Sequence, residues 1–321
     1  MENNKIIPPE KTNLHPRNKH RLGYNFSELV KSYPNLATFV KHNIYGNESI
    51  EFSNSEAVLA LNKSLLVHFY NTEFWDIPTN YLCPPIPSRA DYIHYIADLL
   101  ATSNNNSMPI GVQISVLDIG VGANCIYPII GRKEYGWKFI ASDIDQQALD
   151  YAGNIVRKNS LLNGFVELRL QTTALQVFKG VVRPSDKFDV SICNPPFHAS
   201  LAEAKAMNEL KWKKLGLKNG LKSNFNFGGK ANELCYKGGE AAFLHTMIDE
   251  SVLFKDSCFW FTTLVSKKEN LESVYYLLKK HNAVEVKTIP MSQGQKNSRI
   301  VAWTFLNTSQ QNEWRTNRWK S

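Results

Sequence analysis

A short polar turn after a buried strand carries the most specific chemical signal in this sequence of 321 residues. Residues 188–193 read as a strand, and Asn194, Pro195, Pro196 and Phe197 follow it directly. The prolines fix the backbone, so the Asn194 side-chain oxygen and the Pro195 carbonyl oxygen can face one point as two hydrogen-bond acceptors. Phe197 adds a ring on which a flat base or amide can stack. Two acceptors match the two N–H bonds of an exocyclic amine, so this turn favours methyl transfer to a planar nitrogen, a reaction in which positioning supplies much of the rate.

Two further motifs predict a site for a cofactor that contains a nucleoside. A buried strand runs into Gly120 and Gly122, which permit a tight turn and a close approach of the backbone to a ligand. Asp118, just before this turn, disfavours a pyrophosphate and suits the cationic amino-acid end of S-adenosylmethionine. Cys125 stands where a dinucleotide fingerprint has its third glycine, which weakens a dinucleotide reading. Asp143 ends the next strand, where an acid can bind both hydroxyls of an adenosine ribose.

Strands and helices that alternate along the chain must bring these motifs together. We expect strands at residues 115–119, 138–142, 166–170, 188–193 and 257–265 with a terminal pair at 284–289 and 300–305, and helices at 91–100, 124–130, 146–159 and 271–280. Such alternation predicts an α/β fold with a parallel sheet and helices on both faces. Ligands of these sheets lie beyond the carboxyl ends of the strands, where all three motifs fall.

Residues 1–88 differ from the rest of the chain and are expected to form a basic, mainly helical N-terminal extension. Apolar residues at helical spacing predict helices near 26–33 and 57–69. The stretch 83–88 contains three prolines and predicts a stiff, extended connector. Residues 89–306 then form the domain that holds the three motifs.

Basic residues outnumber acidic ones by 37 to 29, and the net charge of +8 favours a polyanionic partner. A loop insertion at 201–240 carries eight lysines and two acidic residues between positions 205 and 237, and a basic tail covers 307–321. In residues 1–45, basic and aromatic side chains are interleaved, which fits phosphate contacts and base stacking on irregular RNA. A solvated basic surface without any partner is the alternative interpretation of these segments.

The distribution of cysteine, histidine and apolar residues excludes several classes. The five cysteines lack any Cys-x-x-Cys spacing, and the eight histidines show no metal-ligand spacing. Residues 1–12 lack the apolar core of a signal peptide, and no apolar run approaches the roughly 20 residues that span a bilayer. We therefore expect a cytoplasmic protein that binds no metal and no membrane.

The motifs Asp118-Ile-Gly120-Val-Gly122, Asp143 and Asn194-Pro-Pro-Phe197 resemble those of the class I S-adenosylmethionine-dependent amino-methyltransferases. The chain resembles in particular the ribosomal RNA large subunit methyltransferase F family, which methylates adenine N6 in 23S rRNA, and its eukaryotic relative, methyltransferase-like protein 16. Further resemblance lies in residues 15–18, 87–94, 122–128, 226–229, 238–240 and 293–299. It implies a class I Rossmann-like methyltransferase domain, a helical RNA-binding part and S-adenosylmethionine as cofactor.

The resemblance also implies roles for individual residues. Arg89 would contact the cofactor carboxylate, Asp143 would bind the ribose, and Asn194 would orient the amine. The cofactor-binding set comprises Arg89, Asp118, Gly120, Gly122, Asn124, Asp143 and Thr173, of which Thr173 is expected near the adenine. The residues expected to contact RNA are Arg17, Lys19, Arg21, Lys230, Lys296 and Arg299.

The expected reaction is methyl transfer to the N6 of a specific adenine in 23S rRNA, either free or within a large-subunit assembly intermediate. The target adenine must be flipped out or already unpaired to reach the pocket. Two alternatives stay open: a protein glutamine N5-methyltransferase with a similar Asn-Pro-Pro turn, and a non-catalytic RNA-binding protein with a methyltransferase fold. The basic arm argues against the first, and the intact Asp118, Asp143 and Asn194 argue against the second.

Overall fold

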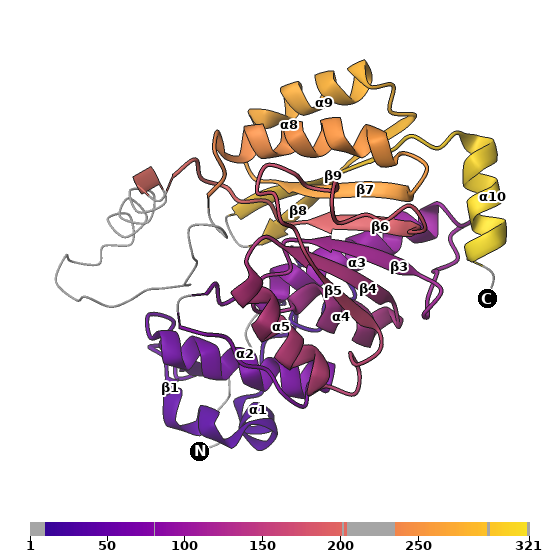
Figure 1. The fold of residues 1–321 in the computed structure, drawn as a ribbon. Coiled ribbons are helices and arrows are strands. Elements are labelled where there is room, and N and C mark those ends of the chain that lie inside the picture. The colour runs from indigo at the N-terminus through magenta and orange to yellow at the C-terminus, as the bar shows by residue number, and fades with distance from the viewer. Residues whose placement is uncertain (1–9, 80, 201, 204–234, 294–295, 320–321) are drawn as a thin grey trace.

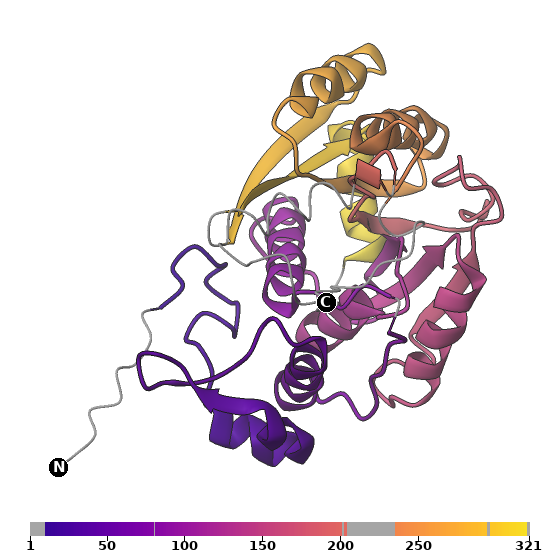
Figure 2. The same ribbon diagram turned by 90° about the vertical axis from the view of Figure 1, so that its left-hand side faces the viewer.

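The computed structural model describes residues 10–79, 81–200, 202–203, 235–293 and 296–319, with the backbone alone for 292, 293, 296 and 297. The N-terminal part, indigo to violet in Figures 1 and 2, lies on one side of a central sheet, and the orange helices lie on the other. Within the described residues, no helix is long and apolar enough to cross a membrane.

A seven-stranded sheet with the strand order β5-β4-β3-β6-β7-β9-β8 forms the centre of the fold. Its parallel part comprises β3 (Ser115–Ile119), β4 (Lys138–Asp143), β5 (Val166–Leu170), β6 (Phe188–Cys193) and β7 (Cys258–Val265). The two remaining strands, β8 (Glu285–Gln293) and β9 (Lys296–Thr304), are antiparallel to their neighbours. The expectation of a parallel sheet is therefore wrong for the terminal pair, because two residues between β8 and β9 are too few for the crossover that a parallel pair needs.

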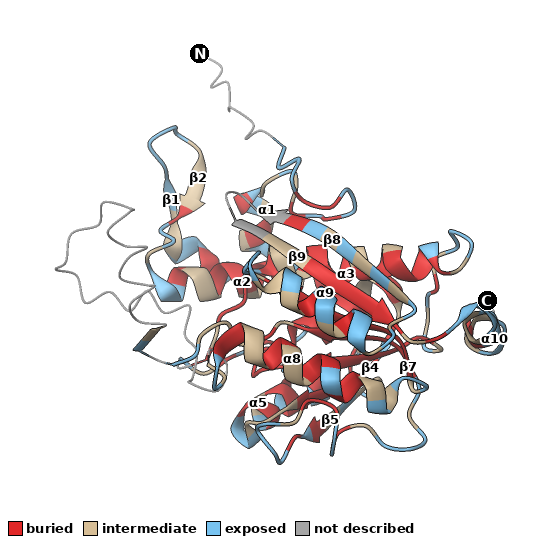
Figure 3. Ribbon diagram, turned by 90° about the horizontal axis from the view of Figure 1, so that it is seen from above, coloured by how far each residue is buried: buried red, intermediate tan, exposed pale blue. Residues whose placement is uncertain are grey.

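Helices cover both faces of the sheet, as the alternating pattern predicted. They are α3 (Ile86–Thr102), α4 (Ile126–Tyr135), α5 (Gln146–Arg157), α8 (Gly239–Ser251) and α9 (Asn270–Lys280). Successive strand residues point to opposite faces, so Val116 joins the hydrophobic cluster under α3, α4 and α5, whereas Leu117 joins the cluster under α8 and α9. Figure 3 shows exposed residues on the outward side of α9 and buried residues along the strands beneath it.

The N-terminal part shares the core of the sheet domain. It contains α1 (Phe26–Ser32), a short 3-10 helix (Pro34–Phe39), α2 (Ser55–Tyr70) and an unpredicted hairpin of β1 (Val40–His42) and β2 (Glu48–Ile50). Asn54 caps α2 by accepting bonds from the N–H groups of Glu56 and Ala57. Leu29 and Leu65 belong to the same hydrophobic cluster as Ile129 of α4.

The proline-rich stretch 83–88 is extended only as far as Pro85. Pro85 is the N-cap of α3, and Pro87 occupies the first turn, where its missing N–H breaks no helical bond. Residues 86–88, expected to belong to the connector, are thus the first turn of a helix. The side-chain amide of Asn62 donates to the carbonyl oxygen of Pro84 at 2.8 Å and holds the extended part against α2.

Two further segments differ from their predicted description. The basic tail is a helix, α10 (Thr308–Arg318), at one end of the sheet (Figure 1). Its Trp314 and Arg318 side chains donate to the fully buried carboxylate of Asp189, which ties this helix to β6. The insertion at 201–240 ends earlier than expected, because residues 239 and 240 begin α8; most of it lies outside the described residues.

Candidate active site

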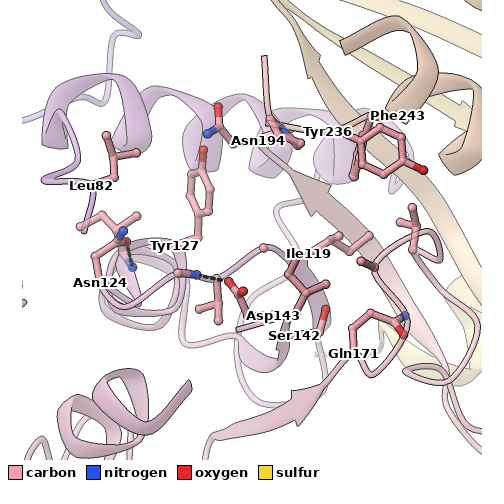
Figure 4. A pocket seen from close by; sticks show the side chains of 18 of the residues that line it. Leu82, Ile119, Asn124, Tyr127, Ser142, Asp143, Gln171, Asn194, Tyr236 and Phe243 are labelled. Carbon is pink, nitrogen blue, oxygen red and sulfur yellow. Dashed lines mark hydrogen bonds between the residues drawn. The ribbon is translucent and has the colours of Figure 1, made fainter. Parts of the chain in front are cut away.

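A pocket opens at the carboxyl ends of β3, β4 and β6, where the three sequence motifs meet. Its lining includes Arg89, Gly120, Gly122, Asn124, Asp143 and Asn194. Figure 4 shows the side chains of Tyr127, Asp143 and Asn194 pointing into the same space. The register explains this meeting: Ile119 pairs with Cys193, so the glycine turn and the Asn194 turn leave neighbouring strands at the same level.

The glycine turn takes a conformation that needs glycine. Gly120 has φ +79° and Gly122 has φ +61°, both in the left-handed region that side chains disfavour. The N–H groups of Gly120 and Val121 both donate to the carbonyl oxygen of Ser142 at 2.9 Å, which ties the turn to β4. Cys125, where a dinucleotide site has glycine, also has a positive φ of +53° before α4 begins.

The carboxylate of Asp143 is held on both sides by backbone donors. Its Oδ2 accepts from the N–H of Gly122 at 2.8 Å, and its Oδ1 accepts from the N–H of Asp145 at 3.0 Å. Each oxygen keeps further acceptor capacity, which suits two ribose hydroxyls as donors. Burial raises the pKa of this carboxyl, and the two backbone donors oppose the shift.

Asp118 lies fully buried beneath the glycine turn, and neither carboxylate oxygen has a hydrogen-bond partner among the described residues. Burial, and then the charge of Asp143, raise its pKa well above the ordinary value, while the charge of Arg89 acts in the opposite direction. A buried carboxylate without donors is unfavourable unless a cation compensates it. The residues therefore fit the amino-acid end of S-adenosylmethionine, whose ammonium group offers that charge and three donors.

Arg89 reaches the pocket from the first turns of α3. Its Nη1 lies 3.5 Å from the side-chain oxygen of Asn194, and its guanidinium carbon lies 5.7 Å from the ring centroid of Tyr127. Arg89 therefore places a positive charge in the pocket, and Asp118, which is buried outside the lining, acts on it from beneath the glycine turn. Such a pair of charges suits a ligand end that carries both a carboxylate and an ammonium group.

Only part of the Asn194 turn lines the pocket. Asn194 and Pro196 line the pocket, Asn194 being half-buried, whereas Pro195 is buried and Phe197 is half-buried outside the lining. Thr173 is also outside the lining: it is exposed, and its N–H donates to the side-chain oxygen of Gln171 at 2.9 Å. Gln171 itself and Ala174 do line the pocket.

The residues of the N-terminal part that are expected to contact RNA each pair with a carboxylate. Arg17 pairs with Asp98, Lys19 with Glu134, and Arg21 with Glu10. Half-buried Arg299 lies in β9 opposite Val265 of β7, and its Nη1 is buried without a hydrogen-bond partner among the described residues. Lys230 lies outside the described residues, and of Lys296 the structure describes only the backbone, at the start of β9.

Several residues that hold the pocket were missed in the sequence because their partners are distant. The indole of Trp75 donates to the carbonyl oxygen of Asn124 at 2.8 Å, and the hydroxyl of Tyr81 donates to the Asp145 carboxylate at 2.8 Å. Glu250 of α8 accepts three backbone N–H bonds, from residues 177, 178 and 179, and so fixes the loop after β5 that lines the pocket. No local pattern marks these residues.

Comparison with known proteins agrees with this architecture. A family model described as RNA methyltransferase matches residues 9–307. The ribosomal RNA large subunit methyltransferase F of Yersinia enterocolitica is 51% identical, with 99% of this chain and 96% of that protein covered. The protein of the same name from Cytophaga hutchinsonii is 52% identical, with 99% of each chain covered.

Solved structures of human METTL16 share the fold, a Rossmann-like methyltransferase. Its catalytic domain in complex with the MAT2A 3′UTR hairpin 1 superposes with a TM-score of 0.77 at 29% identity, covering 92% of this chain and 96% of that one. Its N-terminal domain in complex with SAH superposes with a TM-score of 0.71 at 26% identity, covering 92% and 99%. The cofactor of this chain is S-adenosylmethionine, and the chain belongs to the RNA methyltransferase family.

Proposed function

We propose that this chain transfers a methyl group from S-adenosylmethionine to the N6 of a specific adenine in 23S rRNA. The observation that carries the proposal is the position of Asn194, whose side chain lines the same pocket as the glycine turn and Asp143. The names of the relatives support ribosomal RNA as the substrate class. The choice of an adenine, of its N6 position and of the 23S molecule goes beyond what these names state.

In this proposal each end of the cofactor has its own residues. Arg89 binds the carboxylate, Asp118 binds the ammonium group and Asp143 binds the ribose hydroxyls. The remaining contacts come from Gly120, Gly122 and Asn124 in the turn, and from Thr173 in the loop that flanks the adenine. The side-chain oxygen of Asn124 already accepts from the N–H of Ile126 at 3.2 Å, which leaves its amide N–H bonds for the ligand.

The Asn194 turn performs the chemistry by orienting the amine. When bound, S-adenosylmethionine supplies an electrophilic methyl carbon. The side-chain oxygen of Asn194 and the carbonyl oxygen of Pro195 accept the two N–H bonds of the amine, and Phe197 stacks on the base. This hold favours a more pyramidal nitrogen whose lone pair points at the methyl carbon, and the proton leaves after transfer, so no dedicated base is required.

RNA is proposed to approach over the N-terminal part and the insertion. Arg17, Lys19 and Arg21 each hold a carboxylate at the surface of the protein, so a phosphate would compete with Asp98, Glu134 and Glu10 for them. Lys230, Lys296 and Arg299 would contact the strand on the other side of the target. The division into 1–88, 89–306 and 307–321, the cytoplasmic location and the choice between free 23S rRNA and an assembly intermediate also belong to the proposal.

The test is methyl transfer by the purified chain from labelled S-adenosylmethionine. Undermodified 23S rRNA and a release-factor protein serve as the two substrates, and nucleoside mass spectrometry identifies the product. We expect N6-methyladenosine at one position of the RNA. The Asn194→Ala variant should lose at least about 100-fold in kcat, because a misplaced amine loses the near-attack geometry. Label in the release factor would favour the glutamine reaction, and label in neither substrate would favour a non-catalytic RNA-binding protein.

A further inference from the structure

The strand β6, which ends just before Asn194, is joined to its neighbour by two buried hydroxyl groups in addition to the ladder. Ladder pairing of β6 with β7 ends at Ser191, which lies opposite Phe261. Beyond that point the Thr262 hydroxyl donates to the carbonyl oxygen of Ser191 at 2.7 Å, and the Tyr92 hydroxyl lies 2.9 Å from the Thr262 hydroxyl. The N–H of Cys193 donates to the Tyr92 hydroxyl at 3.3 Å.

The direction of this chain of bonds follows from the number of protons. A hydroxyl has one proton, and the Thr262 proton points at Ser191, so Tyr92 donates to Thr262 and accepts from Cys193. The contact of Tyr92 with the carbonyl oxygen of Cys193, at 3.4 Å, is then the weaker one. The tyrosine is fully buried, so its hydroxyl has no water to replace these partners. The N–H of the Ile192–Cys193 peptide, one residue before Asn194, is thereby fixed.

Helix α3 holds residues 193 and 194 from two sides. Arg89 and Tyr92 are three residues apart and share one face of the helix. Arg89 contacts the side-chain oxygen of Asn194, while Tyr92 holds the backbone of Cys193. A shift of α3 would therefore move the amide oxygen and its backbone together.

We infer that Tyr92 is a positioning residue for methyl transfer, which sets the peptide before Asn194 so that the amide oxygen faces the target amine. The inference rests on the proposed role of Asn194. Tyr92 does not line the pocket; it acts through the hydrogen-bonded chain to Thr262 and Cys193. Small displacements of a reacting group reduce rate far more than binding, so the effect belongs in kcat.

The experiment compares Tyr92→Phe, which removes only the hydroxyl, with the wild-type chain on undermodified 23S rRNA. We expect kcat to fall about tenfold, while the KM for RNA and the Kd for S-adenosylhomocysteine change less than about twofold. Thr262→Val should produce a similar loss, and Thr262→Ser, which retains the hydroxyl, should restore most of the rate. Tyr70→Phe is the matched control, since Tyr70 is equally buried and its hydroxyl bonds His20 at 2.9 Å, away from the pocket.

A double-variant comparison separates this role from a general effect on folding. In an Asn194→Ala background, Tyr92→Phe should cause no further loss, because the residue that it positions is gone. An equal loss in both backgrounds, or a loss that Tyr70→Phe reproduces, overturns the inference. Should Tyr92→Phe fail to fold, the Thr262 variants test the same chain of bonds from its other end. Full activity of Asn194→Ala overturns the proposed function itself, whereas full activity of both Tyr92→Phe and Thr262→Val overturns only the role of Tyr92.

Discussion

Two buried aspartates at opposite ends of neighbouring strands show how differently the two edges of this sheet are built. Asp189, at the amino end of β6, accepts bonds from the N–H of Ser115, the indoles of Trp314 and Trp319, and the guanidinium of Arg318. Asp118, near the carboxyl end of β3, has no hydrogen-bond partner among the described residues. Both side chains are fully buried.

The difference separates a carboxylate that the fold itself satisfies from one that has no donor among the described residues. A buried charge that is paired and hydrogen-bonded holds a fold together, and here it locks α10 against the sheet. A buried carboxylate without donors weakens the fold and is retained where function needs it. The amino edge of the sheet is thus closed by the chain itself, while in the proposed function the carboxyl edge binds the cofactor.

The largest expected effect comes from Asp118→Asn. Removing the charge should weaken binding of S-adenosylmethionine by 100-fold or more, which corresponds to about 3 kcal/mol for a desolvated charge pair. Calorimetric titration measures this loss. Asp189→Asn is the matched control, because it removes an equally buried charge at the other edge. An unchanged Kd in Asp118→Asn would contradict the division between the two edges.

Asp189→Asn should instead reduce the free energy of unfolding by about 3 kcal/mol, since it leaves Arg318 without its charge partner and replaces one of the two acceptor oxygens with an amide donor. Urea unfolding followed by tryptophan fluorescence measures the change. The cofactor Kd of the folded protein should stay within about twofold of wild type. The exposed Asp150→Asn on α5 should change stability by less than about 0.5 kcal/mol. Equal stability of Asp189→Asn and wild type would show that α10 is held by packing alone.

The raised pKa of Asp118 also predicts that cofactor affinity depends on pH, with a smaller effect than that of Asp118→Asn. Below the folded pKa the carboxyl is neutral and offers no charge to an ammonium group, so cofactor affinity should fall about tenfold per pH unit on the acidic side. Above that pKa the affinity should level off. Titration with S-adenosylhomocysteine from the ordinary carboxyl pKa of about 4 upward measures this dependence. Asp118→Asn should flatten the acidic limb, and an acidic limb that persists in the variant would assign it to another group, such as Asp143.

The same pKa shift makes the stability of the fold decrease with rising pH, whereas cofactor affinity increases. The folded pKa lies above the ordinary value of 3.8, so the folded state holds the proton more tightly than the unfolded chain, and stability is lost as pH rises toward the folded pKa. Asp118→Asn should therefore melt at a higher temperature than wild type near about pH 8, and the two should converge near about pH 4. A variant less stable than wild type at both values would contradict this.

The strands and the glycine turn were predictable because short local stretches of sequence determine them. Three strands, Ser115–Ile119, Val166–Leu170 and Phe188–Cys193, have the bounds that the sequence predicted. Buried parallel strands are short apolar runs with sharp polar ends, and the motifs at those ends meet because the sheet is parallel. The direction of β9 was missed because a hairpin makes this strand antiparallel to β7. The helix α8 was missed because it begins at two glycines, which are unfavourable in helices.

Side-chain partners were the part that sequence could not supply. Arg17 was read as an RNA contact, and it also bonds Asp98, 81 residues further along the chain. The tail was read from its charges, yet Trp319 reaches Asp189 across 130 residues. The neighbouring sequence of a basic or aromatic residue is the same whether its partner is RNA or a distant carboxylate. Only the fold decides which partners are within reach.

The smallest predicted effect comes from two buried indoles, one beside the carboxyl edge of the sheet and one beside its amino edge. Trp75 donates to the carbonyl oxygen of Asn124 in the cofactor turn, and Trp137, just before β4, donates to the carbonyl oxygen of Pro109 at 3.0 Å. Trp75→Phe and Trp137→Phe each remove one buried hydrogen bond and shrink a buried ring, so both should lower the free energy of unfolding by about 2 kcal/mol. Only Trp75→Phe should also weaken cofactor binding, by about fivefold, because it loosens the turn on the ligand side. Equal cofactor Kd values for the two variants would show that the N-terminal part stabilises the fold without contributing to the geometry of the site.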